Sequence, residues 1–241
     1  MTPPETPPVP AAVLFDLDDT LYPERAFVDG GFQAVAQLLA GPSGRSAASL
    51  VERLWALHDR DGRGRLFDAL IAELGLDDAD GALAAACVQA YRTQEVRLEP
   101  FPGVIELLDG LRRRGVRTGV VSDGYGAVQA RKVAALGEVA TRLDVVVLTD
   151  DLGLGHAKPS PTAFRVACRL LEVEPSATIY VGNDPRKDFI GARAAGLRTI
   201  RVGDLPNEGG GAAIEIHPAD DADLSVDSIG ALDAVLSGMT T

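Results

Sequence analysis

The sequence predicts an α/β fold in which a doubly wound parallel sheet carries an inserted α-helical bundle. Beyond residue 101, short Val-rich and Ile-rich segments alternate with helical segments, which is typical of parallel strands covered on both faces. Before that point, a stretch of about eighty residues with helical periodicity follows the first strand. A chain of 241 residues is long enough for one domain with a large insertion, or for two domains.

The first predicted strand, 11–15, is an apolar run that is followed at once by carboxylates. Asp16, Asp18 and Asp19 cannot enter a core unless something compensates their charge. Successive side chains of a strand alternate in direction, so Asp16 and Asp18 point the same way as the chain leaves the sheet. Two convergent carboxylates suit a hard divalent cation such as Mg²⁺. The alternative, a helix start capped by an aspartate, would need only one of them.

After Thr20 the periodicity becomes helical. Apolar residues recur on one face of each of four segments, and short polar or glycine-containing turns join them. These segments are typical of a small helical bundle inserted after the first strand. The expected helices are 24–40, 47–58, 62–74 and 80–95.

The turn sequence Phe101-Pro102-Gly103 marks the return to alternating helix and strand. The expected helices are 104–114, 126–136, 161–171, 186–195 and 228–236, and the expected strands are 117–122, 144–148, 178–182, 198–202 and 213–216. Three glycines at 209–211 predict a flexible loop before the last strand. The chain is therefore divided into a disordered N-terminal lead at 1–10, an α/β catalytic core at 11–21 and 101–241, and a helical cap at 22–100.

The composition excludes some classes of function. The chain has 23 Lys and Arg against 35 Asp and Glu, and a net charge of −12 argues against a nucleic-acid or anionic-membrane partner. A small metabolite is the better expectation, and no pattern indicates the oligomeric state. The first ten residues resemble neither a signal peptide nor a membrane anchor, which favours a cytoplasmic protein. Cys87 and Cys168 lack metal-ligand spacing and are expected to be buried without a disulfide.

Polar residues follow four of the predicted strands. Ligands of doubly wound sheets collect outside the carboxyl ends of the strands, so these residues should meet at one edge. They are Asp16 and Asp18 after the first strand, Ser122, Asp123 and Gly124 after the second, Lys158 beyond the third, and Asn183, Asp184 and Asp188 after the fourth.

These residues, in this order, resemble the four motifs of the haloacid dehalogenase-like hydrolase superfamily, and the helical insertion resembles that family's cap. The resemblance extends from about Ala11 to Val202. It implies that Asp16 is a nucleophile that becomes an aspartyl-phosphate, and that Asp18 is the general acid and base. It also implies that Ser122 and neighbouring amides hold the phosphoryl oxygens, and that Lys158 offsets the negative charge.

The resemblance further implies a Mg²⁺ ion bound by Asp16, by the main-chain carbonyl of Asp18 and by Asp184. In the fourth motif Asn183 is the alternative contact; a carboxylate is the harder ligand, which favours Asp184. Asp188 is expected to support the metal waters or Lys158. Asp123 stands where Asn is frequent, so we leave it outside the chemical steps; Asp123 and Gly124 are expected to support the site.

Family members that cleave carbon–halogen bonds lack the second carboxylate of the first motif, so Asp18 favours phosphate chemistry over haloacid chemistry. We therefore expect a Mg²⁺-dependent phosphatase that acts on a small phosphomonoester. Sugar phosphates, phosphoglycolate-like acids and nucleoside monophosphates remain open as substrates. The alternatives are a phosphomutase acting on a sugar phosphate, a haloacid dehalogenase, or a phosphate-binding module without turnover. In the expected cap, a basic cluster of Arg60, Arg63 and Arg65 is more typical of a solvated face than of a substrate contact.

Overall fold

The computed structural model describes residues 8–203 and 220–239, and it confirms the doubly wound α/β class. The described strands form one six-stranded sheet in the order β3-β2-β1-β4-β5-β6, and every pairing in it is parallel. Their bounds are β1 Ala12–Phe15, β2 Arg117–Ser122, β3 Val145–Leu148, β4 Thr178–Gly182, β5 Arg198–Val202 and β6 Leu224–Val226.

Strand β1 lies inside the sheet, between β2 and β4. All four of its side chains are fully buried, which explains its continuous apolar sequence. Phe15 is in register with Val120 on one side and Val181 on the other, and the amide of Asp16 donates to the carbonyl of Val181 at 2.8 Å. The strand order reverses around β1, so its carboxyl end is the place where a ligand is expected.

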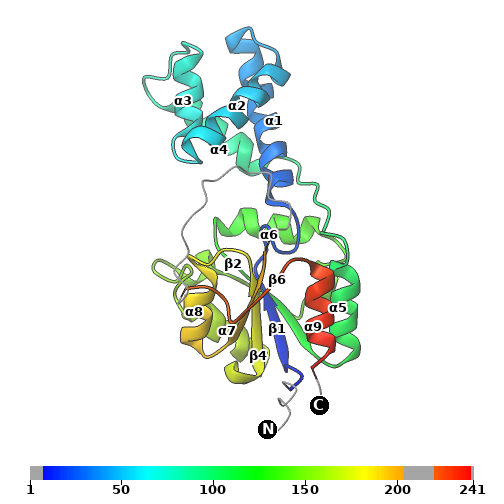
Figure 1. Ribbon diagram of the computed structural model, residues 1–241. Helices are drawn as coiled ribbons and strands as arrows, with labels where there is room; N and C mark the ends of the chain where they lie inside the picture. Colours follow the sequence, from blue (N-terminus) through cyan, green and yellow to red (C-terminus); the bar gives the residue numbers. More distant parts are fainter. Residues whose placement is uncertain (1–7, 204–219, 240–241) are drawn as a thin grey trace. The chain divides into compact units, whose positions relative to one another are not determined.

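Helices cover both faces of the sheet (Figure 1). Helices α5 (Val104–Arg113) and α9 (Ile229–Ser237) lie side by side on one face, and α7 (Thr162–Leu170) and α8 (Asp188–Ala195) pack together on the other. The second face holds one continuous apolar cluster, which includes Leu14, Val121, Phe164, Tyr180 and Phe189. Helix α6 (Gly126–Ala135) follows β2 directly, and three short 3₁₀ helices are η1 Ala140–Arg142, η2 Thr149–Leu152 and η3 Pro175–Ala177.

The four helices predicted after the first strand are all present, with shifted ends. They are α1 Glu24–Ser43, α2 Ala47–Asp61, α3 Leu66–Glu73 and α4 Ala82–Thr93. They bury a core of their own, in which Phe32, Leu54 and Leu70 are almost completely shielded from solvent. Helix α2 begins where Ser46 accepts a hydrogen bond from the amide of Ser49, a typical N-cap.

The chain divides into two compact units. Among the described residues, one unit comprises 24–97, and the α/β unit comprises 8–23, 98–203 and 220–239. The predicted strand at 213–216, the glycine loop at 209–211 and residues 1–7 of the predicted N-terminal lead lie outside the described residues. The sequence patterns did not reveal strand β6, whose three residues are too short to show a period of two.

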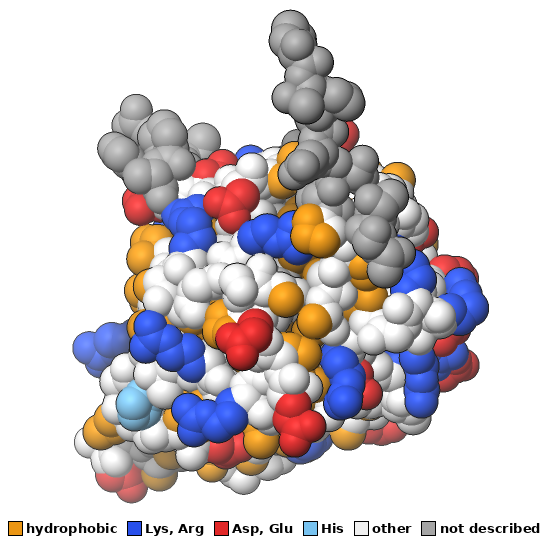
Figure 2. Space-filling view, turned by 90° about the horizontal axis from the view of Figure 1, so that it is seen from below, with side chains coloured by type: hydrophobic (Ala, Val, Ile, Leu, Met, Phe, Trp, Pro, Cys, Tyr) orange, Lys and Arg blue, Asp and Glu red, His pale blue; other side chains and the backbone are white. Residues whose placement is uncertain are grey.

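The sequence predicts that the two cysteines are buried without forming a disulfide. Cys87 and Cys168 are both free and buried, which confirms their interpretation as small hydrophobic residues. Seen from below, Lys and Arg side chains alternate with Asp and Glu across the molecule (Figure 2). Within the described ranges, no helix combines the length and the apolar character that a membrane crossing requires.

Candidate active site

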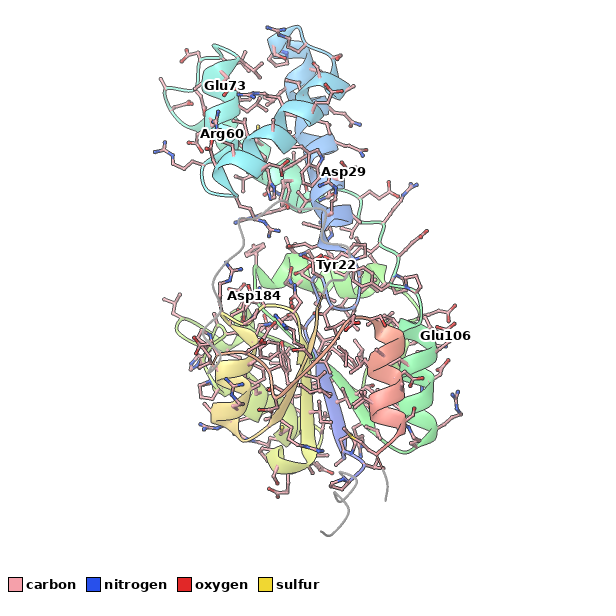
Figure 3. All side chains as sticks on the ribbon, viewed as in Figure 1. Tyr22, Asp29, Arg60, Glu73, Glu106 and Asp184 are labelled. Atoms are coloured by element: carbon pink, nitrogen blue, oxygen red, sulfur yellow. The ribbon has the colours of Figure 1, made fainter. Side chains whose placement is uncertain are left out.

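The loop after β1 places the first two predicted site residues at the carboxyl end of that strand. Asp16 is buried, with 3% of its surface exposed, and Asp18 is partly buried. The chain then turns sharply through Asp19, whose φ of 53° lies in the left-handed region. This turn brings Tyr22 back so that its hydroxyl donates to Asp18 Oδ1. In Figure 3, Tyr22 and Asp184 both lie at the edge of the α/β unit where β1 and β4 end.

Lys158 connects two carboxylates that come from different strand ends. Its Nζ lies 2.6 Å from Asp16 Oδ1 and 2.7 Å from Asp188 Oδ1, and its side chain is completely shielded from solvent. The same nitrogen donates to the hydroxyl of Tyr180 at 3.0 Å, and that hydroxyl donates to Asp188 Oδ1 at 3.2 Å. One buried positive charge therefore faces two buried carboxylates.

Asp188 also fixes the backbone of the loop after β4. Its Oδ2 accepts hydrogen bonds from the amides of Asn183 and Asp184, at 3.1 Å and 2.9 Å. Only a glycine fits at position 182, because a Cβ there would lie 2.5 Å from Asp188 Oδ2. Asp188 and the loop at 182–184 are thus one structural unit. The prediction that Asp188 supports Lys158 agrees with the observed contact.

Burial dominates the electrostatics of Asp16. It raises the pKa of Asp16 to about 7, because desolvation and the nearby Asp188 carboxylate outweigh the opposing effect of Lys158. Burial alone would lower the pKa of Lys158, but Asp16, Tyr180 and Asp188 reverse this and hold it well above its usual value. Burial likewise raises the pKa of Tyr180. Lys158 is therefore a fixed cation, whereas Asp16 needs a further positive charge to stay ionised at neutral pH.

Asp18 is held by three side chains of the α/β unit. Lys132 Nζ lies 2.8 Å from Oδ1 and 3.0 Å from Oδ2, and Gln129 Nε2 donates to Oδ2 at 2.9 Å. Tyr22 supplies the third contact. Burial raises the pKa of Asp18, but the Lys132 ammonium and these hydrogen bonds more than offset it, so the pKa of Asp18 lies below its usual value. The arrangement holds Asp18 as a carboxylate.

The residues of the second motif lie where β2 meets α6. Ser122 is 1% exposed, and its Oγ accepts a hydrogen bond from Gln129 Nε2 at 2.6 Å. Asp123 is directed away from the aspartates. Its Oδ1 accepts from the hydroxyl of Thr149 at 2.8 Å and from the main-chain amide of Lys158 at 3.1 Å. Asp123 therefore ties the loop that carries Lys158 to the end of β2.

The fourth-motif acid that we favoured, Asp184, is engaged elsewhere in this structure. Arg186 donates to both of its carboxylate oxygens, at 2.8 Å and 2.7 Å. Burial raises the pKa of Asp184. The hydrogen bonds with Arg186 and the positive charges of Lys187 and Arg186 lower it by more, so the pKa of Asp184 lies below its usual value. The structure brings Asp16, Lys158 and Asp188 into contact, and joins Asp18 to Ser122 through Gln129.

The chemistry of these donors can be compared with the needs of a divalent cation. Within the described residues, Asp16 Oδ2 is buried and accepts no hydrogen bond, which suits an oxygen that binds a cation. The same residues contain no group of three or more His, Cys, Asp or Glu side chains arranged to hold a metal. The predicted set is compatible with this, because it uses two carboxylates and one main-chain carbonyl. Asp16 fits the ion, and Asp184 fits it if its carboxylate leaves Arg186.

Sequence analysis missed four residues of this site: Tyr22, Gln129, Lys132 and Tyr180. The signal for Gln129 and Lys132 was a pair of long polar side chains three residues apart, on a helix that starts directly after the second motif. Both are almost fully buried, which a helical pattern cannot reveal without knowing the partner face. Tyr180 resembled an ordinary apolar residue of a buried strand.

The basic cluster of the helical unit is solvent-exposed, as expected. Arg60 pairs with Asp61, Arg63 with Glu24, and Arg65 with Asp68, and all three guanidinium groups lie in exposed side chains. Exposed pairs of this kind contribute little to stability. The cluster is thus a solvated face.

The fold and the site together define an α/β protein with a carboxylate-centred site at the switch point of its sheet. Residues 10–196 match the family model described as haloacid dehalogenase-like hydrolase, and the chain belongs to this family.

Comparison with known proteins agrees with that assignment. The chain is 34% identical to a glyceraldehyde 3-phosphate phosphatase of Methanopyrus kandleri, over 79% of this chain and 83% of the relative. It is 32% identical to a phosphoglycolate phosphatase of Cupriavidus necator, over 94% of this chain and 93% of the relative. The crystal structure of a HAD phosphatase from Thermococcus onnurineus matches with a TM-score of 0.62 and 24% identity, covering 95% of this chain and 99% of that one.

Proposed function

We propose that the chain is a Mg²⁺-dependent phosphatase that hydrolyses a small phosphomonoester through an aspartyl-phosphate on Asp16. The observation that carries the proposal is the state of the Asp16 carboxylate. One oxygen is held by Lys158 at 2.6 Å, and the other is buried without a hydrogen bond among the described residues. The two oxygens can therefore take different roles: the one without a hydrogen bond suits the cation, and the one held by Lys158 is positioned to attack phosphorus.

The remaining residues take roles that follow from their contacts. Lys158 offsets the charge on Asp16 and on the phosphoryl group, while Asp188 and Tyr180 keep the lysine in place. Ser122 donates to a phosphoryl oxygen. Fixed cations and donors of this kind supply most of the catalysis in phosphoryl transfer, where positioning and charge stabilisation dominate.

In the first step, Asp16 forms a bond to phosphorus as the ester oxygen leaves, and Asp18 gives that oxygen a proton that it has taken up from solvent or, in later turnovers, from the hydrolytic water of the preceding second step. In the second step, Asp18 accepts a proton from the water that attacks the aspartyl-phosphate, and Asp16 is released as a carboxylate. The contacts of Asp18 with Lys132 and Gln129 hold it in the ionised form that the second step needs.

The residues that would hold Mg²⁺ are Asp16, the main-chain carbonyl of Asp18, and Asp184, with Asn183 as the alternative to Asp184. When bound, the ion supplies positive charge that allows an anionic nucleophile to approach an anionic ester. The pKa of Asp16, raised by burial to about 7, supports this need for a cation.

The proposed substrate class is a small, soluble phosphate ester. Two relatives are named for glyceraldehyde 3-phosphate and phosphoglycolate, which are phosphate esters of two or three carbons. Sugar phosphates and nucleoside monophosphates belong in the same panel, because they are also small phosphate esters. A cytoplasmic location remains a prediction from the sequence.

The test is release of inorganic phosphate from this panel by the purified full chain with Mg²⁺, beside the Asp16→Asn variant. We expect turnover of at least one ester, its loss in EDTA, and a fall of about 10³-fold or more in the variant. Isomerised sugar phosphate without free phosphate would show a mutase instead. Inactivity of the wild type across the whole panel would favour a binding module, and equal activity of Asp16→Asn would exclude the proposed nucleophile.

A further inference from the structure

One buried side chain that the four motifs do not include touches two of the proposed functional residues. Gln129 lies on α6 and is 3% exposed. Its Nε2 donates to Ser122 Oγ at 2.6 Å and to Asp18 Oδ2 at 2.9 Å. The orientation of the amide follows from these partners, because an ionised carboxylate only accepts hydrogen bonds and must therefore face the NH₂ group.

The surrounding backbone leaves room for this side chain. Gly124 has a φ of 126°, and a Cβ there would lie 3.3 Å from Gln129 Cδ. Helix α6 is fixed at its start by a hydrogen bond from the amide of Gly126 to Asp150 Oδ2 at 2.8 Å. The side-chain amide of Gln129 thus belongs to a helix that is fixed at its start, directly after the turn at 122–124.

The contact with Ser122 determines where the serine hydrogen points. A hydroxyl group has one hydrogen to donate and two lone pairs that accept. Because Gln129 donates to one lone pair of Ser122 Oγ, the hydrogen of Ser122 cannot point toward Gln129 and is directed to another acceptor. A phosphoryl oxygen is such an acceptor.

We propose that Gln129 is a positioning residue that orients the Ser122 hydroxyl as a hydrogen-bond donor to the phosphoryl group and holds Asp18 in register with it. The proposal rests on the proposed function for the role of Asp18, whereas the link between Gln129 and Ser122 requires only that the site binds a tetrahedral oxyanion. Gln129 acts through its two neighbours and does not touch the substrate.

The experiment is a double-mutant cycle on the full chain with Mg²⁺, read by calorimetric titration with tungstate. The variants are Gln129→Met, which is close in shape and cannot donate, Ser122→Ala, and the two combined. We expect Gln129→Met to weaken tungstate binding about tenfold in the wild type and less than about twofold beside Ser122→Ala, because the two residues act as one unit. A similar loss in both backgrounds, or no loss, would overturn the proposal.

Two further variants accompany the cycle. Gln89→Met makes the same replacement at an exposed position on α4 and should leave tungstate binding unchanged. Gln129→Glu keeps the length of the side chain but replaces the donor by a carboxylate beside Asp18, so it should lose at least about tenfold in tungstate affinity, and its melting temperature should fall because this buried carboxylate and that of Asp18 repel each other. Wild-type affinity in Gln129→Glu would contradict the role of the donor.

The turnover of phosphate esters gives a second readout. We expect kcat to fall about 10- to 100-fold in Gln129→Met, with a smaller rise in KM, because the misplaced groups act on the transition state. If the wild type binds tungstate but hydrolyses no ester, the proposed function fails and the cycle still decides the role of Gln129. If the wild type binds no tungstate, the proposal for Gln129 is wrong, whereas the proposed function is still decided by the turnover of phosphate esters.

Discussion

Replacing Lys158 by methionine tests the charge balance at the centre of the site. The substitution keeps the length of the side chain and removes the ammonium that lies 2.6 Å from Asp16 and 2.7 Å from Asp188. Both carboxylates are almost fully shielded from solvent, so water cannot replace the lost partner. Removing one member of a buried ion pair costs about 3–5 kcal/mol, and we expect a loss of stability in that range at pH 8.

The loss should depend on pH with a definite sign. In the wild type, burial already raises the pKa of Asp16 from 3.8 to about 7, and without Lys158 only the smaller effect of Lys187 opposes that rise. A carboxyl group whose pKa is higher in the folded than in the unfolded state stabilises folding at low pH and loses that contribution as the pH rises. Lys158→Met should therefore be less destabilised at pH 5 than at pH 8.

Urea unfolding in EDTA at both pH values measures these differences. Lys187→Met is the matched control, because Lys187 is 39% exposed and lies 4.0 Å from Asp184, and it should change stability by less than about 1 kcal/mol. The pair Lys158→Met with Asp188→Asn should recover part of the loss, because it also removes one buried charge. A loss below about 1 kcal/mol for Lys158→Met at pH 8 would refute the reasoning.

Three other outcomes follow from single contacts. In EDTA, the stability of the wild type relative to Asp16→Asn should fall as the pH rises from about 4 to about 7. The reason is that the pKa of Asp16 is about 7 in the folded chain and 3.8 in the unfolded chain. A difference in melting temperature between the two proteins that does not change with pH would contradict this. Gly182→Ala would place a Cβ 2.5 Å from the buried Asp188 Oδ2 and should lower the free energy of unfolding in urea by about 1–3 kcal/mol. The control is Gly41→Ala, which has nothing within 4 Å of the added Cβ and should not destabilise the chain. Asp123→Ala removes the acceptor for the amide of Lys158 and should cost about 1–3 kcal/mol, with Asp123→Asn close to the wild type; equal losses in both would argue against the acceptor role.

The sequence predicted the position of the site because charged residues follow predicted strands at their carboxyl ends. Asp16 lies more than a hundred residues before Lys158 and Asp188 in the sequence. The rule that the carboxyl ends of parallel strands share one edge still predicted that the three residues would meet. The fold class was predictable for a similar reason, because alternating periodicities are a local property of the chain. The roles of the residues in this cluster stay predictions.

What could not be predicted depends on contacts between elements. Gln129 and Lys132 are polar residues of an amphipathic helix, and in isolation Lys132 is typical of a last helical turn, where cations are favoured. Only the packing of α6 against β3 and η2 turns both side chains toward Asp18. The direction of the Asp123 side chain could not be predicted for the same reason, since its partners are Thr149, at the start of η2, and Lys158, in the loop beyond it.

When Asp16 is ionised, the single ammonium shared by Asp16 and Asp188 leaves that part of the site with an excess of negative charge before anything binds. A phosphate ester arriving alone would be repelled, and a divalent ion arriving alone would be attracted, so the two ligands should bind with positive thermodynamic coupling. Because such coupling is reciprocal, the ester should tighten the affinity for the ion by the same factor by which the ion tightens the affinity for the ester. In a cell, the chain would then respond to the joint concentration of free magnesium and ester.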